Sequence, residues 1–208
     1  NKGYCDMLFN VKDNVVQEVK EQPFKSEKEL QTLCENNLQK LINLEFVDTE
    51  LSVADFRLDT VAFDKEVNSF VIIEYKNQRN VSVIDQGYTY LSTMFNHKAD
   101  FVLWYNIKFH DNKDLNDFDW SQSRVIIIIP NFTKYQINSI NFKDMPIELW
   151  KIKRYQNNTM SFEQIISANS DESINSIAPI LDTDIKQEVS KETKTYSEKE
   201  LIDVAYDC

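Results

Sequence analysis

The segment SFVIIEYKN, Ser69–Asn77, decides the fold because most of it is typical of a strand in a protein interior. Its apolar run from Phe70 to Ile73 predicts burial. Near its end, Glu74 and Lys76 stand two residues apart, and residues i and i+2 of a strand point to the same face. Charges on so apolar a strand are costly unless they are paired or bind a ligand. A Glu–Lys pair at the solvent end of the strand is the plain interpretation, and a binding site is the other.

The preceding strand-like run, DFRLDTVAF, brings a second carboxylate to this face. Asp59 lies fifteen residues before Glu74, and the turn DKEVN between the runs predicts an antiparallel hairpin. The hairpin places the two carboxylates side by side, where they repel unless one is protonated or a divalent cation joins them. Mg²⁺ favours carboxylate oxygens and takes further oxygens from phosphates. With Lys76 placed to orient or deprotonate a water, the set predicts metal-assisted phosphodiester hydrolysis.

Hydrophobic patterning predicts the other elements. Helices are expected from Ser26 to Ile42 and from Val83 to His97, each opened by a capping box, and a short helix near FTKYQINSI. An N-terminal hairpin is expected from MLFNV and VVQEV, and further strands are expected over LEFVDTEL, DFVLWYNI, RVIIII and IELWKIKRY. This order predicts an α/β fold in which helices flank a mixed central β-sheet.

Composition limits the class of protein. Hydrophobic residues make up 42% of the 208, which is enough for a sizeable core, and no apolar run is long enough to span a membrane. The three cysteines, an odd number without a CxxC pair, predict reduced thiols in a cytoplasmic protein. Most of the net charge of −11 lies after residue 155, where there are eleven acidic and four basic residues. The mildly acidic remainder argues against an indiscriminate nucleic-acid coat but not against a local basic cleft.

Asp59, Glu74 and Lys76, in the pattern RLD followed by EYK with Glu74 fifteen positions after Asp59, resemble the motif of the PD-(D/E)xK nuclease superfamily. The helix that follows carries QGYTY, which matches the Q-x-x-x-Y of the RecB-like and NucS-like branches with Gln86 and Tyr90. These two residues lie one above the other on a helix. The segments NHKADFVLWYN, DWSQSRVIIIIPNFTKYQ and DMPIELWKIKRY are similar to a group of uncharacterised bacterial proteins that carry this domain.

The resemblance implies a restriction-endonuclease-like core and a role for each motif residue. Asp59, Glu74 and the backbone carbonyl of Tyr75 would hold Mg²⁺ or Mn²⁺, and Lys76 would activate water. Gln86 and Tyr90 would position the phosphate strand of DNA.

The family also has a glutamate in its first helix, which we assign to Glu27. Helical geometry aims Glu27 at the middle of the apolar stripe, whereas Glu35 lies on its edge and Glu29 on the far side. A first-turn acid favoured by the helix dipole is the alternative for Glu27.

The first motif departs from the family, because FRLD lacks the usual Pro or Gly before the aspartate. Arg57 in this motif could bind a phosphate or pair with Asp55. Other residues have plainer interpretations: His97 as a helix cap, the tryptophans as core, and a solvated charged face for Arg124, Lys151, Lys153 and Arg154.

The resemblance also implies the domain organisation. Residues 1–167 are expected to form the nuclease-like domain, and 168–208 an acidic linker with the start of a second domain that is cut short. The leading hypothesis is a Mg²⁺-dependent deoxyribonuclease acting on DNA, with no membrane partner and with a homodimer left open. The alternatives are an inactive nuclease-fold module that binds nucleic acid or a partner protein, and a purely structural domain.

Overall fold

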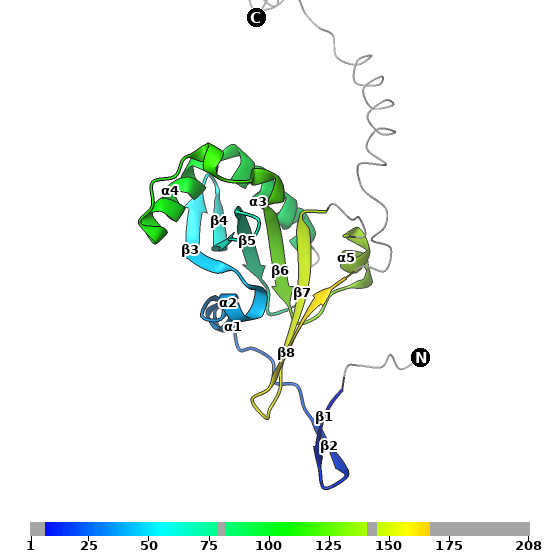
Figure 1. Ribbon diagram of the computed structural model, residues 1–208. Helices are drawn as coiled ribbons and strands as arrows, with labels where there is room; N and C mark the ends of the chain where they lie inside the picture. The colour runs from blue at the N-terminus through cyan, green and yellow to red at the C-terminus, as the bar shows by residue number, and fades with distance from the viewer. Residues whose placement is uncertain (1–6, 79–81, 141–144, 167–208) are drawn as a thin grey trace, which may run out of the picture. The chain divides into compact units, whose positions relative to one another are not determined.

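The computed structural model describes residues 7–78, 82–140 and 145–166 of the chain (Figure 1). Its helices are α1 (Glu27–Glu35), α2 (Leu38–Ile42), α3 (Val83–Asn96), α4 (Lys98–Phe109) and α5 (Lys134–Ser139). Its strands are β1 (Leu8–Lys12), β2 (Val15–Val19), β3 (Glu45–Val53), β4 (Phe56–Asp64), β5 (Ser69–Tyr75), β6 (Arg124–Ile129), β7 (Ile147–Arg154) and β8 (Met160–Ile165). The predicted linker at 168–208, and Cys5 and Cys208, lie outside the described residues.

A six-stranded sheet in the order β3-β4-β5-β6-β7-β8 forms the centre of the fold, and β1 and β2 form a separate hairpin. β3, β4 and β5 run antiparallel, β5, β6 and β7 run parallel, and β8 returns antiparallel to β7. The predicted mixed sheet, the N-terminal hairpin and the β4–β5 hairpin are therefore confirmed. β8 was not predicted from the sequence.

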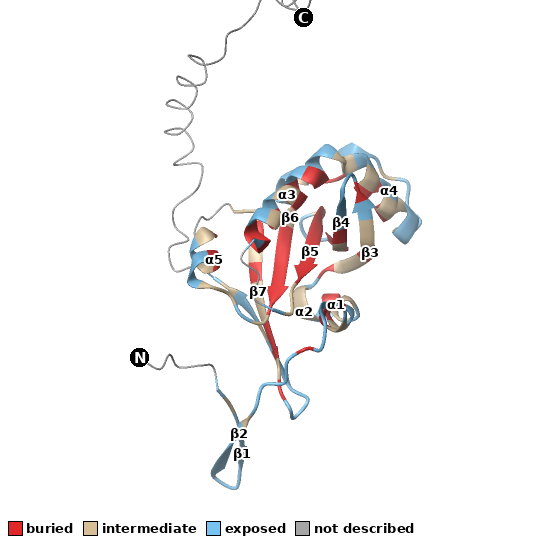
Figure 2. Cartoon of the chain, turned by 180° about the vertical axis from the view of Figure 1, so that it is seen from behind, coloured by how far each residue is buried: buried red, intermediate tan, exposed pale blue. Residues whose placement is uncertain are grey.

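Helices cover both faces of this sheet, as the predicted α/β fold requires (Figure 1). Phe70 and Ile72 of β5 belong to the core that α3 and α4 close. Val71, Ile73 and Tyr75, which alternate with them, belong to the core under α1 and α2. Because both faces of β5 are covered, all its residues are buried, and Figure 2 shows β5 and β6 in the buried colour. The glutamate of this strand is therefore held inside the protein.

The predicted helix from Ser26 to Ile42 is divided in two by a pair of asparagines. α1 ends with Asn36 as its C-cap, and α2 begins after Asn37. The side chain of Asn37 donates to the backbone oxygen of Leu33 at 2.8 Å. Asparagine competes for backbone hydrogen bonds in this way and is a poor helix former, which explains the break. The Ser26 cap is confirmed, because its side chain accepts from the backbone N–H of Glu29, but Ser82 makes no side-chain capping bond at α3.

The predicted strand over Asp100–Ile107 is wrong, because this segment belongs to helix α4. Phe101 and Tyr105, one helical turn apart, are buried, whereas Leu103 and Ile107 are more than half exposed. A short apolar run does not by itself distinguish a strand from a helix. The parallel pairing of β5 and β6 decides in favour of helix, since parallel neighbours need a crossover connection between them.

In the described part of the chain, no helix is both long and apolar enough to cross a membrane.

Candidate active site

The end of the β4–β5 ladder places Asp59. The two strands pair from Asp64 opposite Ser69 to Thr60 opposite Ile73. Beyond that point, Asp59 Oδ2 accepts a hydrogen bond from the backbone N–H of Tyr75 at 3.1 Å. The Asp59 carboxylate thus binds the backbone N–H of the residue that follows Glu74 in β5, as the predicted hairpin requires. Sequence alternation and turn length were sufficient to place this pair.

Glu74 is the point where the other motif residues meet. Its Oε1 accepts from Lys76 Nζ at 2.7 Å and from Gln86 Nε2 at 2.8 Å. Gln86 Nε2 also lies 2.6 Å from the hydroxyl oxygen of Tyr90, and that hydroxyl donates to the backbone oxygen of Arg57 at 3.2 Å. The i, i+4 spacing of Gln86 and Tyr90 on α3 thus presents both side chains to the ends of β4 and β5.

Burial makes it unfavourable for both carboxylates, Asp59 and Glu74, to be charged at the same time. Glu74 is only 2% exposed. Burial first, and then the charge of Asp59, raises the pKa of Glu74 to about 7. Burial also raises the pKa of Asp59, against the opposing effect of the Tyr75 N–H and of Lys76. The repulsion between the two carboxylates is therefore relieved when one of them binds a proton or when both bind a cation.

Lys76 supplies one positive charge to this pair. Burial alone would lower the pKa of Lys76, but its hydrogen bond to Glu74 and the charges of Glu74, Glu27 and Asp59 raise it overall. Its side chain is 17% exposed, so part of it reaches solvent at the edge of the site. Lys76 is therefore a cation held directly beside the carboxylates.

Glu27 lies at the rim of the same site. It is the first residue of α1, its side chain is 48% exposed, and its Oε2 is 3.6 Å from Lys76 Nζ. All the side chains predicted for the site are thus brought together, with Glu27 contacting the lysine.

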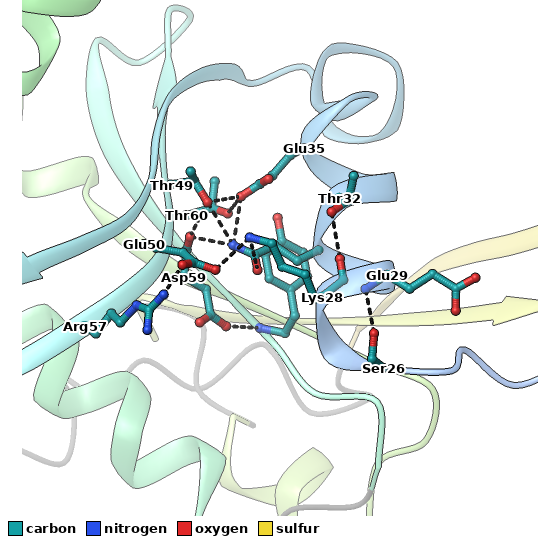
Figure 3. Close-up of polar contacts among 12 residues, drawn as sticks. Ser26, Lys28, Glu29, Thr32, Glu35, Thr49, Glu50, Arg57, Asp59 and Thr60 are labelled. Carbon is teal, nitrogen blue, oxygen red and sulfur yellow. Dashed lines mark hydrogen bonds and ion pairs between the residues drawn. The ribbon is translucent and has the colours of Figure 1, made fainter.

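A polar network that the sequence did not reveal supports Asp59 from the α1 side of the sheet (Figure 3). Glu35 Oε1 accepts from Thr60 Oγ1 at 2.6 Å, Thr49 Oγ1 at 2.7 Å and Gln31 Nε2 at 2.9 Å. Gln31 Nε2 also donates to the backbone oxygen of Asp59 at 2.8 Å. The i, i+4 spacing of Gln31 and Glu35 was the one available signal, and their strand partners become evident only from the folded structure.

Three of the four cations expected to form a solvated face are instead engaged in ion pairs. Arg124 Nη2 lies 2.9 Å from Asp64, and Arg154 Nη1 lies 2.7 Å from Glu29. Lys153, whose side chain is only 8% exposed, is 3.1 Å from a carboxylate oxygen of Glu21. Arg57 pairs with Glu50 and not with Asp55, so that predicted pair is wrong. The expected roles are confirmed for His97, the C-cap residue of α3, and for Trp104, Trp120 and Trp150, which are partly buried against the core.

The donor set of the site fits a hard divalent cation. Glu74 Oε2 is buried and has no hydrogen-bond partner. Among the described residues, no three His, Cys, Asp or Glu side chains gather to hold a metal ion. Mg²⁺, however, is commonly bound by one or two carboxylates and completes its shell with waters and substrate phosphates. Asp59 and Glu74 supply two carboxylates of the kind that such a site needs.

The structure thus defines a class of protein. It is an α/β fold with paired carboxylates, a lysine and a glutamine at the carboxyl end of a central strand. No family model matches the chain. A Haemophilus influenzae protein described as an "Uncharacterized protein" is 42% identical over 195 residues, which cover 93% of this chain and 63% of that protein.

Two solved structures are similar to the chain. One is a repair endonuclease from Pyrococcus abyssi, with a TM-score of 0.42 and 18% identity over 64% of this chain and 49% of that one. The other is an EndoMS–dsDNA2 complex, with a TM-score of 0.35 and 14% identity over 64% of this chain and 47% of that one. The chain therefore spans between about half and two thirds of the length of these proteins.

Proposed function

We propose that the chain is a metal-dependent DNA endonuclease domain that hydrolyses phosphodiester bonds with Mg²⁺ or Mn²⁺. The observation that carries the proposal is the buried Asp59–Glu74 pair, whose Glu74 Oε1 accepts hydrogen bonds from Lys76 and Gln86. A purely structural role offers no reason to keep two carboxylates together inside the protein, because their mutual repulsion lowers stability.

Each residue has a role in this proposal. Asp59, Glu74 and the carbonyl of Tyr75 hold the cation, which when bound polarises a phosphate oxygen and lowers the pKa of a water. Lys76 activates the attacking water by orienting it and stabilises the negative charge that develops on the phosphate oxygens. Addition of water across one P–O bond leaves a phosphate monoester and a free hydroxyl group.

The residues around this centre position the substrate. The amide of Gln86 and the hydroxyl of Tyr90 are hydrogen-bonded to each other on α3 and face Glu74. Both groups can donate to a phosphate oxygen and hold the strand in line with the water. Glu27, 3.6 Å from Lys76, acts as an auxiliary ligand at the rim.

Cleavage of DNA by single-site variants tests the proposal. The parent chain is incubated with supercoiled plasmid, branched DNA and linear duplex in Mg²⁺ or Mn²⁺. Lys76→Ala and Glu74→Ala should each reduce cleavage by at least about 100-fold, because each removes a charge that acts in the transition state. The matched controls are Lys65→Ala and Glu45→Ala, which break an ion pair of 2.5 Å between the β4–β5 turn and the start of β3. If the site variants cut as well as the parent, the proposal fails.

The second candidate is a nuclease-fold module that binds DNA or a protein without cutting. The acidic balance of the chain, with 34 acidic and 23 basic residues, favours it. Calorimetric titration with Mg²⁺ separates the two functions. A parent chain that binds no Mg²⁺, with or without DNA, supports the module, whereas binding that Glu74→Ala abolishes supports the nuclease.

A further inference from the structure

Three charged side chains meet beside Asp59, outside the carboxylate pair. Glu50 of β3 places one carboxylate oxygen 2.6 Å from Lys28 Nζ and pairs through the other with Arg57. Figure 3 shows Glu50 between the two cations and next to Asp59. Lys28 and Arg57 are 57% and 64% exposed, so both face solvent.

Both cations are tied to groups that hold the active site. Arg57 precedes Asp59 by two residues on β4, and its backbone oxygen accepts from Tyr90. Lys28 Nζ lies 3.3 Å from Gln31 Oε1, and the amide nitrogen of Gln31 donates to the backbone oxygen of Asp59. A phosphate bound by these cations would therefore lie close to a phosphate at Asp59 and Glu74. The two phosphates would belong to the same nucleic-acid strand or to two neighbouring strands.

Glu50 reaches this position through an unusual backbone conformation. Its φ of 53° is left-handed, although it lies within strand β3. The pairs Thr49–Thr60 and Leu51–Leu58 flank it, so Glu50 stands across from Asp59. In a regular ladder, opposed residues share a face, and Glu50 would add a third carboxylate to the site. The left-handed turn breaks the strand alternation, and the carboxylate lies between the two cations instead.

We propose that Lys28 and Arg57 form a binding subsite for a phosphodiester of the DNA backbone, and that Glu50 occupies this subsite in the free protein. The proposal rests on the proposed function and adds to it a substrate contact. A carboxylate and a phosphate share the charge and the oxygen acceptors that an arginine fork and an ammonium group recognise. A phosphate can replace the Glu50 carboxylate at these cations, because ion pairs this exposed are weak. Phe56, 40% exposed and packed edge-to-face on Tyr90, adds an aromatic surface beside the subsite.

DNA binding by the 208-residue chain tests the subsite. Binding is measured with Ca²⁺ in place of Mg²⁺, to duplex and single-stranded oligonucleotides, over a series of salt concentrations. Lys28→Gln and Arg57→Gln should each weaken binding several-fold and lower the slope of log affinity against log salt by about 1. Glu50→Gln should tighten binding about 3- to 10-fold, because the phosphate no longer competes with a carboxylate.

Two controls separate the subsite from a general charge effect. Glu45→Gln removes the same charge from the Lys65–Glu45 pair elsewhere in the sheet and should leave affinity nearly unchanged. In the Lys28→Gln/Arg57→Gln background, Glu50→Gln should no longer tighten binding. Inorganic phosphate should compete only weakly, since the subsite recognises a phosphate presented by the polymer.

Failure of the subsite and failure of the nuclease proposal give different results. If the parent binds and cuts DNA but Glu50→Gln behaves like Glu45→Gln, the subsite is wrong and the nuclease stands. If Glu50→Gln only lowers the melting temperature, Glu50 is a structural link between α1 and β4. If the parent binds no DNA and instead retains a protein partner through this face, both proposals fall.

Discussion

At the scale of single residues, Glu74 combines an acidic group with almost complete burial. It is 2% exposed, and one of its oxygens has no partner. Removing the charge should relieve the repulsion from Asp59 in metal-free protein. We expect Glu74→Gln to raise the free energy of unfolding in EDTA at neutral pH or above by on the order of 1–2 kcal/mol.

In Mg²⁺, the parent should instead be more stable than Glu74→Gln. A cation that binds only the folded state stabilises it. Mg²⁺ should therefore raise the melting temperature of the parent and leave that of Glu74→Gln nearly unchanged. Thermal denaturation with and without Mg²⁺ measures both effects. A Glu74→Gln protein that is less stable than the parent in EDTA would contradict the electrostatic account of the pair.

Cys34 is a second residue whose chemistry depends on burial. Burial raises the pKa of its thiol to about 12. Because the thiolate is the reactive form, the folded protein should react very slowly with a disulfide reagent near pH 8. The test uses a Cys5→Ser/Cys208→Ser chain, in which Cys34 is the remaining thiol, with the same chain in concentrated guanidinium chloride as control. Equal rates in both states would contradict the buried position.

At the scale of elements, the polar network of α1 holds this helix to β3 and β4. Glu35 accepts hydrogen bonds from Gln31, Thr49 and Thr60. Glu35→Ala removes the acceptor that these three donors share, although Gln31 and Thr49 keep the backbone oxygen of Asp59. We therefore expect a loss of about 2 kcal/mol in the free energy of unfolding. Urea denaturation measures it.

The matched control on the same helix is Thr32→Ala, whose exposed hydroxyl donates to the backbone oxygen of Lys28. It should change stability by less than about 0.5 kcal/mol. A Glu35→Ala chain that is no less stable than Thr32→Ala would show that the network does not fasten α1. If Glu35→Ala also weakens Mg²⁺ binding, the network additionally positions Asp59.

Elements were predictable where their signal is local. The continuous apolar run identified β5, the turn before it identified the β4–β5 hairpin, and the i, i+4 stripe identified α3. The asparagine break between α1 and α2 and the helix at Asp100–Ile107 were not identified. In both cases the hydrophobic pattern was consistent with two structures. The Asn37 side chain broke the first helix by competing for its backbone hydrogen bonds, and the parallel pairing of β5 and β6 selected a helix in the second case.

At the scale of the whole molecule, we propose that residues 1–167 form the nuclease-like domain. The buried hydrophobic residues of the described core lie between Phe24 and Tyr155, and the last strand ends at Ile165. Deleting residues 168–208 should therefore change the free energy of unfolding by less than about 1 kcal/mol and leave DNA cleavage intact.

Deletion from Met160 onward is the contrasting truncation. It removes β8, whose Phe162 stacks on Trp150 with ring centroids 4.9 Å apart. Chemical denaturation should then show a large loss of stability, because β7 becomes an unprotected sheet edge. If the shorter deletion, from 168, were as damaging as this one, the proposed boundary would be wrong.

The sequence by itself determined the centre of this protein. Strand parity and hairpin length place Asp59 beside Glu74 and Lys76, and helical periodicity places Gln86 and Tyr90 on one face of α3, because these relations are set by neighbouring residues. Only the tertiary structure decided that α4 is a helix, that Glu35 fastens α1, and that Arg57 meets Glu50. Those outcomes depend on segments distant in the chain and on one left-handed residue, which local patterns do not encode.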